Sequence, residues 1–129
     1  MLTRRKVLGM AAMAIVSAAP AHAEGVMPYT RAAFEAAQKD GKSILVEIHA
    51  PWCPICKAQG PVIEGLLGSP KFKDMVAFSI DFDSQADEVR AMGAQKQSTL
   101  IAFKGAQEMA RSVGDTDPAS IEKLFASAV

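Results

Sequence analysis

The sequence is short of the residues from which many common sites are built. It has two cysteines, two histidines and one tryptophan in 129 residues, and it contains no second C-x-x-C and no H-x3-H pair. A zinc site takes four protein ligands, or three and a water, so this inventory does not complete one. A Gly-rich phosphate loop and a basic patch with interleaved aromatic residues are also missing, and nucleic acid is therefore not an expected partner.

One apolar stretch stands near the N-terminus. Arg4, Arg5 and Lys6 precede residues 7–19, which are rich in Ala, Met and Val, and an A-x-A sequence ends at Ala23. This order is typical of a secretory signal peptide, and the apolar part is shorter than the roughly 20 residues that span a bilayer. We therefore expect residues 1–23 to be a signal peptide cleaved after Ala23, and residues 24–129 to form one domain.

The expected leader indicates export. Residues 3–8, TRRKVL, also resemble a twin-arginine signal, although Val7 stands where that pattern prefers Phe, and ordinary Sec export stays open. Without the leader the chain has 11 Lys plus Arg against 14 Asp plus Glu, a net charge of −3. We expect a periplasmic location in a bacterial envelope, where disulfides can form and persist.

Both cysteines stand in the pentapeptide Trp52-Cys53-Pro54-Ile55-Cys56, directly after the apolar residues 44–48. A C-x-x-C between a strand and a helix is typical of a redox pair. A structural disulfide fits the spacing less well, because a bridge across two residues constrains the unfolded chain little. Half of a zinc site is the other alternative.

Hydrophobic periodicity divides the rest of the chain into alternating helices and strands. We expect helices at 30–39, from the cysteine motif to about 67 with a kink at Gly60-Pro61, from the capping pattern Ser84-x-x-Asp87 to about 93, and from 117 to about 128. We expect strands at 44–49, 76–82, 99–103 and 108–113, with a hairpin turn at 104–107. The order α-β-α-β-α-β-β-α predicts a single α/β domain with a central mixed sheet flanked by helices.

This order, with the cysteine motif after the first expected strand, resembles the thioredoxin superfamily along nearly the whole mature sequence. Residues 44–57 look like the strand, the Trp-Cys-x-x-Cys-Lys active site and the helix start of that family, and Pro61 matches its helix-kinking proline. Glu47 falls where the family carries a buried acid, and residues 99–105 resemble its next strand and hairpin. Residues 30–42 are most similar to exported thioredoxin-like proteins. The resemblance implies a thioredoxin fold.

One position departs from the family. Members place a cis-proline immediately before the Thr-Leu strand, and this chain has Ser98 there. A non-proline cis peptide costs roughly 3 kcal/mol, so we expect a trans Gln97–Ser98 bond and a reshaped substrate groove. The resemblance implies that the proline aligns the substrate backbone and keeps metals off the thiolates. We expect Ser98 either to hydrogen-bond a thiolate or to be a tolerated replacement.

The expected catalytic residues are Cys53, Cys56 and Glu47. Cys53 should lie at the start of its helix, where unsatisfied amides and the helix dipole favour an anion, which makes it the expected nucleophile. Cys56, one turn inward, is expected to be less exposed and to act as the resolving thiol. Glu47 is the expected proton acceptor for Cys56, because desolvation in an apolar strand raises the pKa of its carboxyl and suits it to proton transfer. The alternative is that Glu47 is an ordinary charged residue at a strand edge.

The expected substrate contacts are Trp52, Pro54, Ile55 and Ser98. Trp52 offers a flat apolar surface to partners, or packs in the core. Pro54 and Ile55 place no charge between the cysteines, which favours a reductase. His49 lies on the same strand face as Glu47 by alternation, and it either tunes the response of the site to pH or is a hydrogen-bonded filler.

We therefore expect a periplasmic thiol-disulfide oxidoreductase with no cofactor and no metal, exchanging dithiol and disulfide with protein partners through Cys53 and Cys56. Reduction is the expected direction, and it needs a membrane thiol:disulfide electron donor, because this compartment oxidises free thiols. One alternative is a disulfide oxidase or isomerase. Another is a metal- or cluster-binding protein that uses the two thiolates with Ser98 or His49. We expect a monomer.

Overall fold

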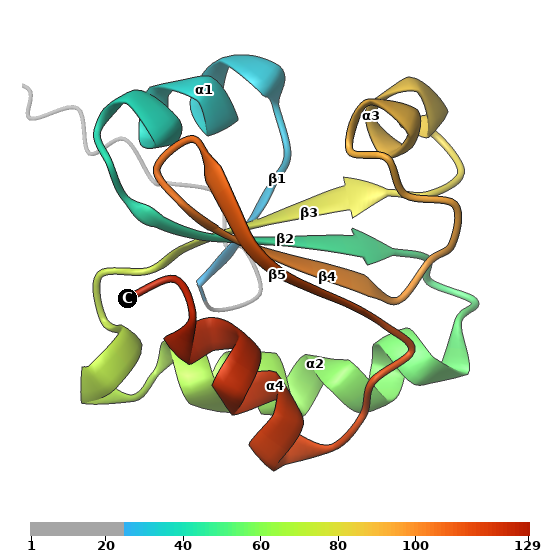
Figure 1. Ribbon diagram of the computed structural model, residues 1–129. Helices are drawn as coiled ribbons and strands as arrows, with labels where there is room; N and C mark the ends of the chain where they lie inside the picture. The colour runs from blue at the N-terminus through green and yellow to red at the C-terminus, as the bar shows by residue number, and fades with distance from the viewer. Residues whose placement is uncertain (1–24) are drawn as a thin grey trace, which may run out of the picture.

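The computed structural model describes residues 25–129 (Figure 1). The expected α/β domain is confirmed: five strands form one mixed sheet in the order β1-β3-β2-β4-β5. The strands are β1 (Val26–Pro28), β2 (Ser43–His49), β3 (Val76–Asp81), β4 (Thr99–Lys104) and β5 (Gln107–Val113). The helices are α1 (Arg31–Lys39), α2 (Pro54–Leu67), α3 (Ala86–Ala91) and α4 (Pro118–Ala126), with a short 3₁₀ helix, η1, at Pro70–Phe72.

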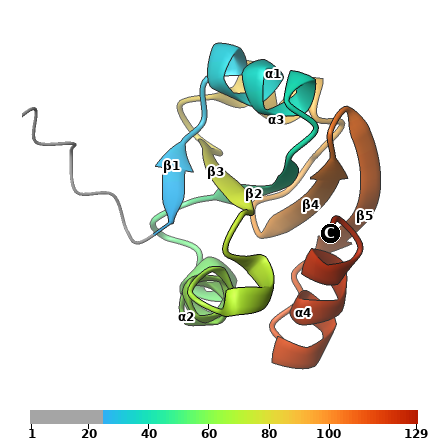
Figure 2. The ribbon, with the colours of Figure 1, turned by 90° about the vertical axis from the view of Figure 1, so that its left-hand side faces the viewer.

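Helices cover both faces of the sheet. Figures 1 and 2 show α1 and α3 on one face and α2 and α4 on the other. β1 and β2 run parallel to β3, whereas β4 is antiparallel to β2 and β5 is antiparallel to β4. No helix within residues 25–129 is both long and apolar enough to cross a membrane.

The side chains of β2 alternate between the two helical layers. Ile44, Val46 and Ile48 belong to the apolar cluster that includes residues of α1 and α3, whereas Leu45 belongs to the cluster formed with α2 and α4. Because side chains of a strand alternate between faces, Glu47 and the histidine two residues later lie on the α2 side. The central strand therefore directs its polar residues towards the helix that carries the cysteines.

Local capping signals set most helix ends. Thr30 caps α1 by accepting the N–H of Ala33 at 3.2 Å, and Gly41 follows that helix with a φ of +67°. Asp117 caps α4 by accepting the N–H of Ser120 at 3.2 Å. Both helices begin within one residue of the expected starts at 30 and 117. α2 runs without a break from Pro54 to Leu67, with Pro61 inside it.

Two details differ from the prediction. The prediction that Ser84 caps the third helix is wrong. Gln85 is the residue before α3, and its side chain makes no capping hydrogen bond. The Asp81 carboxylate instead accepts the N–H groups of Asp83 and Ser84, at 3.0 and 2.8 Å, so the end of β3 builds this turn itself. β1 was not predicted, since three residues give no readable period and this strand is defined by its pairing with β3.

Candidate functional site

The cysteine pair lies at the N-terminal end of α2, just after the carboxyl end of β2, on the right of Figure 1. Cys53 is the N-cap residue, with extended backbone angles, and Pro54 is the first residue of the helix. The Cys53 sulfur accepts the backbone N–H of Cys56 at 3.2 Å. A sulfur in this position receives one of the free amides of the helix start, together with the positive end of the helix dipole.

Both cysteines are free and buried. Cys53 is 1 % exposed and Cys56 is 4 % exposed, so the expectation that Cys56 is the less exposed of the two was wrong. Cys53 is buried because its sulfur turns back onto the first turn of α2, where it caps the helix. The pair packs with Ala50 and the partly buried Phe82.

The Cys56 thiol is held in its protonated form. Burial and the hydrogen bond with Cys53 raise its pKa to about 11, while backbone hydrogen bonds from Ala50 and Ser98 act in the opposite direction. The thiol also points at the Ile48 carbonyl, with 3.9 Å between sulfur and oxygen. Cys56 therefore needs a base before it can attack another sulfur.

A cavity of about 280 Å³ beneath α2 joins Cys56 to the polar residues of β2. Its lining consists of Val26, Pro28, Glu47, His49, Cys56, Gly60, Ile63, Glu64 and Ser79. Glu47 and His49 line it together, which confirms that they share a strand face. A cavity of this size has room for water, so a proton can pass between the Cys56 thiol and the Glu47 carboxylate without direct contact.

Burial is the main influence on Glu47. Desolvation raises the pKa of its carboxyl, while the charge of His49 and a hydrogen bond from the Ser79 hydroxyl lower it. Glu47 lies in the middle of the sheet, opposite Ser79 of β3 and Leu100 of β4. The alternative of a charged residue at a strand edge is therefore wrong.

Ser98 adopts an unusual backbone conformation beside the cysteines. Within residues 25–129 there is no cis peptide, so the trans Gln97–Ser98 bond is confirmed, and Ser98 has a φ of +63°. Its hydroxyl donates to the Gln97 carbonyl and not to a sulfur. Its backbone N–H donates to the Ile48 carbonyl at 2.7 Å, and the same amide helps to lower the pKa of Cys56.

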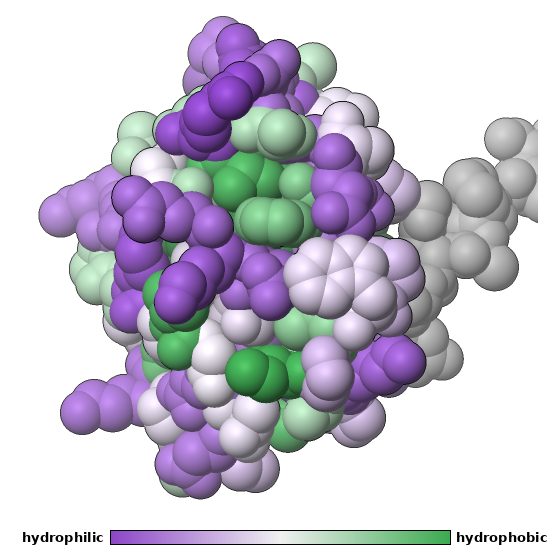
Figure 3. Space-filling model, turned by 90° about the vertical axis from the view of Figure 1, so that its right-hand side faces the viewer, coloured by the Kyte–Doolittle hydropathy of each residue, from purple (hydrophilic) through white to green (hydrophobic). Residues whose placement is uncertain are grey.

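Apolar side chains lie at the surface around the cysteine pair. Trp52 is 55 % exposed, and Ile55 and Val113 are also exposed. The indole N–H of Trp52 donates to the Asp83 carboxylate at 2.7 Å, which holds the ring at the surface and not in the core. Figure 3 looks onto this end of the molecule, where pale and green residues gather between purple ones.

Gln59 belongs to the site, and sequence reasoning missed it. It is 2 % exposed, and its side-chain amide donates to the Ser98 carbonyl at 3.2 Å and to the Asp115 carbonyl at 2.9 Å. A signal was available, since Cys56, Gln59 and Ile63 recur at helical spacing and form the buried face of α2. A glutamine in such a stripe needs buried partners.

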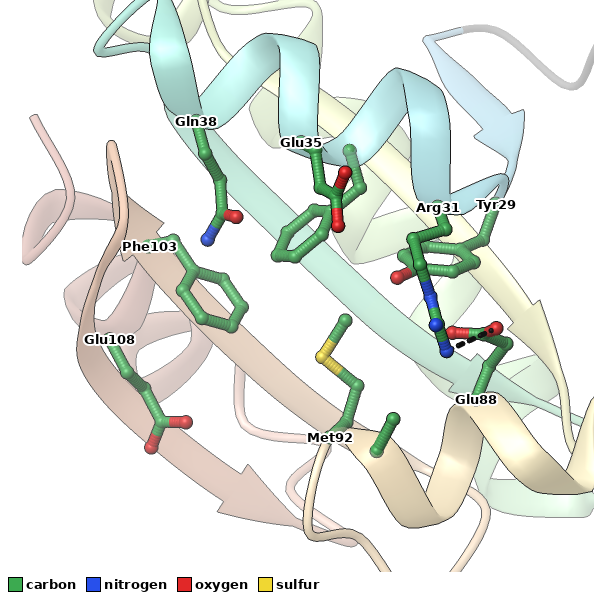
Figure 4. A pocket seen from close by; sticks show the side chains of 10 residues that line it. Tyr29, Arg31, Glu35, Gln38, Glu88, Met92, Phe103 and Glu108 are labelled. Carbon is green, nitrogen blue, oxygen red and sulfur yellow. Dashed lines mark hydrogen bonds and ion pairs between the residues drawn. The ribbon is translucent and has the colours of Figure 1, made fainter.

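A larger cavity, of about 410 Å³, lies on the opposite face of the sheet (Figure 4). Arg31 of α1 and Glu88 of α3 form an ion pair there at 3.0 Å. Burial, with a further contribution from Glu88, raises the pKa of Tyr29 to about 12. The lining includes none of the predicted site residues. This cavity is therefore separate from the cysteine site.

The metal-binding alternative lacks a ligand set in the described part of the chain. Within residues 25–129, no group of three His, Cys, Asp or Glu side chains is placed so as to hold a metal ion. The Ser98 hydroxyl, which this alternative also invoked, is turned towards its own backbone.

Comparison with known proteins extends the similarity beyond the cysteine motif. The model of the family described as Thioredoxin matches residues 25–127. Thioredoxin-2 of Saccharomyces cerevisiae is 33% identical over 88 residues, which is 68% of this chain and 82% of the relative. The crystal structure of Trxlp from Edwardsiella tarda EIB202 is 37% identical, with a TM-score of 0.76 over 78% of this chain and 97% of that chain. The similarity therefore covers the described domain.

The raised pKa of Glu47 predicts a pH-dependent stability. Below an unfolded-state pKa of about 4.3 both states are protonated, and the folded state keeps its proton as the pH rises further. Stability should therefore fall from about pH 4.3 upwards through the folded-state pKa, and then level off. In Glu47→Gln this part of the decline should disappear, measured by urea unfolding between pH 4 and pH 9.

Ser79→Ala provides the matched comparison. Loss of the hydroxyl that lowers the pKa of Glu47 should raise the folded-state pKa further, so the decline should extend to higher pH and become larger. A Glu47→Gln variant with the same pH profile as the parent protein would contradict the assignment of this carboxyl.

Proposed function

Because the chain belongs to the thioredoxin family, whose members are thiol-disulfide oxidoreductases, we propose that it exchanges dithiol and disulfide with protein partners through Cys53 and Cys56. The observation that carries this assignment is the capped sulfur: Cys53 begins α2 and accepts the Cys56 amide at 3.2 Å. Thiolate attack at Cys53 is favoured by this amide and by the helix dipole. We further propose that the protein works as a monomer in the periplasm.

The exchange proceeds in two displacements. The Cys53 thiolate attacks one sulfur of a partner disulfide, a mixed disulfide forms, and the other partner sulfur leaves as a thiolate that takes a proton. Cys56 then gives its proton to Glu47 through the cavity beneath α2 and attacks the Cys53 sulfur. The Cys53–Cys56 disulfide forms, the second partner sulfur leaves, and two electrons have passed to the partner.

The partner is proposed to lie against the exposed surface around Trp52, Pro54 and Ile55. The side chains of this surface are apolar and uncharged, so the surface suits contact with a polypeptide better than contact with a small charged thiol. The backbone of Ser98 lies beside the cysteines, where it contributes an amide and shapes the surface that the partner meets. Its hydroxyl already donates to the Gln97 carbonyl. An extended segment carrying the disulfide is the substrate that this surface fits.

Reduction is the direction that the site favours. No charged residue stands between the two cysteines to stabilise a thiolate there, so the dithiol form gains no added electrostatic stabilisation from that source. We therefore expect the reduction potential of the pair to lie near that of thioredoxin, about −270 mV, in equilibrium with a redox buffer. A potential near about −120 mV would reverse the direction and make the protein a disulfide donor. A reductase in this compartment takes its electrons from a membrane thiol:disulfide donor.

The catalytic assignment predicts different outcomes for the two cysteines. Cys53→Ala should abolish reduction of insulin, because the attacking sulfur is gone. Cys56→Ala should retain the first step and accumulate mixed disulfides, visible on a non-reducing gel and removed by dithiothreitol. Ser43→Ala, which loses only a hydrogen bond to the Ala128 carbonyl at 2.6 Å, serves as the control with normal rates. Insulin reduction by the Cys53→Ala variant would refute the assignment.

Export is proposed from residues 1–23, which lie outside the described residues. The basic start, apolar middle and A-x-A end support a cleaved leader. Mass spectrometry of the periplasmic fraction should find a chain that begins at Glu24. The pair Arg4→Lys and Arg5→Lys should block export if the twin-arginine route is used, and should leave it unchanged under Sec export. An uncleaved chain confined to the cytoplasmic fraction would contradict the proposal.

A further inference from the structure

Ser98 is the only non-glycine residue with a positive φ within residues 25–129. For an L-residue the left-handed conformation is unfavourable, because Cβ comes too close to the backbone. Such a conformation persists only where surrounding contacts impose it. Ser98 therefore needs partners that hold it.

Three contacts fix the backbone of Ser98. Its N–H donates to the Ile48 carbonyl at 2.7 Å, and its carbonyl accepts the N–H of Gly114 at 3.1 Å. The same carbonyl accepts the side-chain amide of Gln59 at 3.2 Å, and this amide also donates to the Asp115 carbonyl at 2.9 Å. Gln59 thus joins the loop before β4 and the loop after β5 to helix α2.

The position of Gln59 on α2 links this contact to the cysteines. Gln59 follows Cys56 by three residues, so the two share the buried face of the helix. The Cys56 thiol and the Ser98 amide point at the same acceptor, the Ile48 carbonyl. A shift of Ser98 would therefore change the surroundings of the Cys56 sulfur directly.

We propose that Gln59 is a positioning residue, which holds Ser98 in its left-handed conformation and so keeps the Ser98 amide beside the Cys56 sulfur. The effect on Ser98 stands on the hydrogen bonds alone, whereas its effect on catalysis rests on the proposed exchange through Cys53 and Cys56. The backbone amide of Ser98 also helps to lower the pKa of Cys56, so its displacement disfavours the Cys56 thiolate that attacks the mixed disulfide. Burying the Gln59 amide is compensated by its two carbonyl partners.

The first test is Gln59→Met, which keeps the length and flexibility of the side chain and removes its donors. Hydrogen exchange of the Ser98 and Gly114 amides should become about tenfold faster, the factor that corresponds to the cost of the left-handed conformation. The kcat/KM for insulin reduction should fall by a similar factor. Unchanged exchange at both amides would overturn the proposal.

The decisive comparison repeats Gln59→Met in a Ser98→Gly background. Glycine adopts positive φ without steric cost, so the conformation no longer has to be imposed. The same substitution should then change exchange at position 98 and kcat/KM by about twofold or less. An equal effect in both backgrounds would show that Gln59 supplies only general stability, and would overturn the proposal.

Gln85→Met is the matched control. Gln85 also bonds two backbone groups, donating to the Tyr29 carbonyl at 3.2 Å and accepting the N–H of Asp81 at 3.0 Å. Its loss should leave exchange at Ser98 and Gly114 as in the parent protein. If the parent protein itself failed to reduce insulin, the proposed function would fall, while the exchange rates would still decide the role of Gln59.

Discussion

Successive side chains of β2 point to opposite faces of the sheet. This alternation places Glu47 and His49 on the side of α2, the helix that carries the cysteines. The apolar set Ile44, Val46 and Ile48 anchors the strand against α1 and α3. The other set begins with Leu45 and continues with polar residues that line the cavity beneath α2. A shift of one residue in the pairing of β2 would exchange the two sets and bury the polar residues in an apolar layer. The register of this strand is therefore strongly fixed, and the cysteines follow it at its end.

The two sulfurs differ in their hydrogen-bond partners more than in their burial. The Cys53 sulfur accepts an amide at the start of a helix, whereas the Cys56 thiol faces a carbonyl and keeps its proton. Burial raises the pKa of Cys56 and that of Glu47 across the same cavity. Proton transfer costs less as the pKa of the acceptor approaches that of the donor. Desolvation of the carboxyl therefore brings it closer to the role of a base for this thiol.

The part of the structure that local patterns determine could be predicted from the sequence. The cysteine spacing, the alternation of β2 and the helix starts near residues 30 and 117 depend on residues that are close together in the sequence. The structure differs from the prediction where partners distant in sequence decide. β1 exists through its pairing with β3, and Gln59 reaches carbonyls 39 and 56 residues away. No local pattern indicates which loops such a side chain will meet.

Ser98 shows how one departure from a family pattern changes more than shape. Proline at this position would fix φ near −65° and would have no N–H to donate. Serine in the left-handed conformation presents an amide to the Ile48 carbonyl and to the neighbouring sulfur. The chain thereby gains a donor beside Cys56, and it needs a residue to hold that donor in place. Gln59 meets this need from within α2, so a change in the loop before β4 is matched by a polar residue in the buried face of the active-site helix.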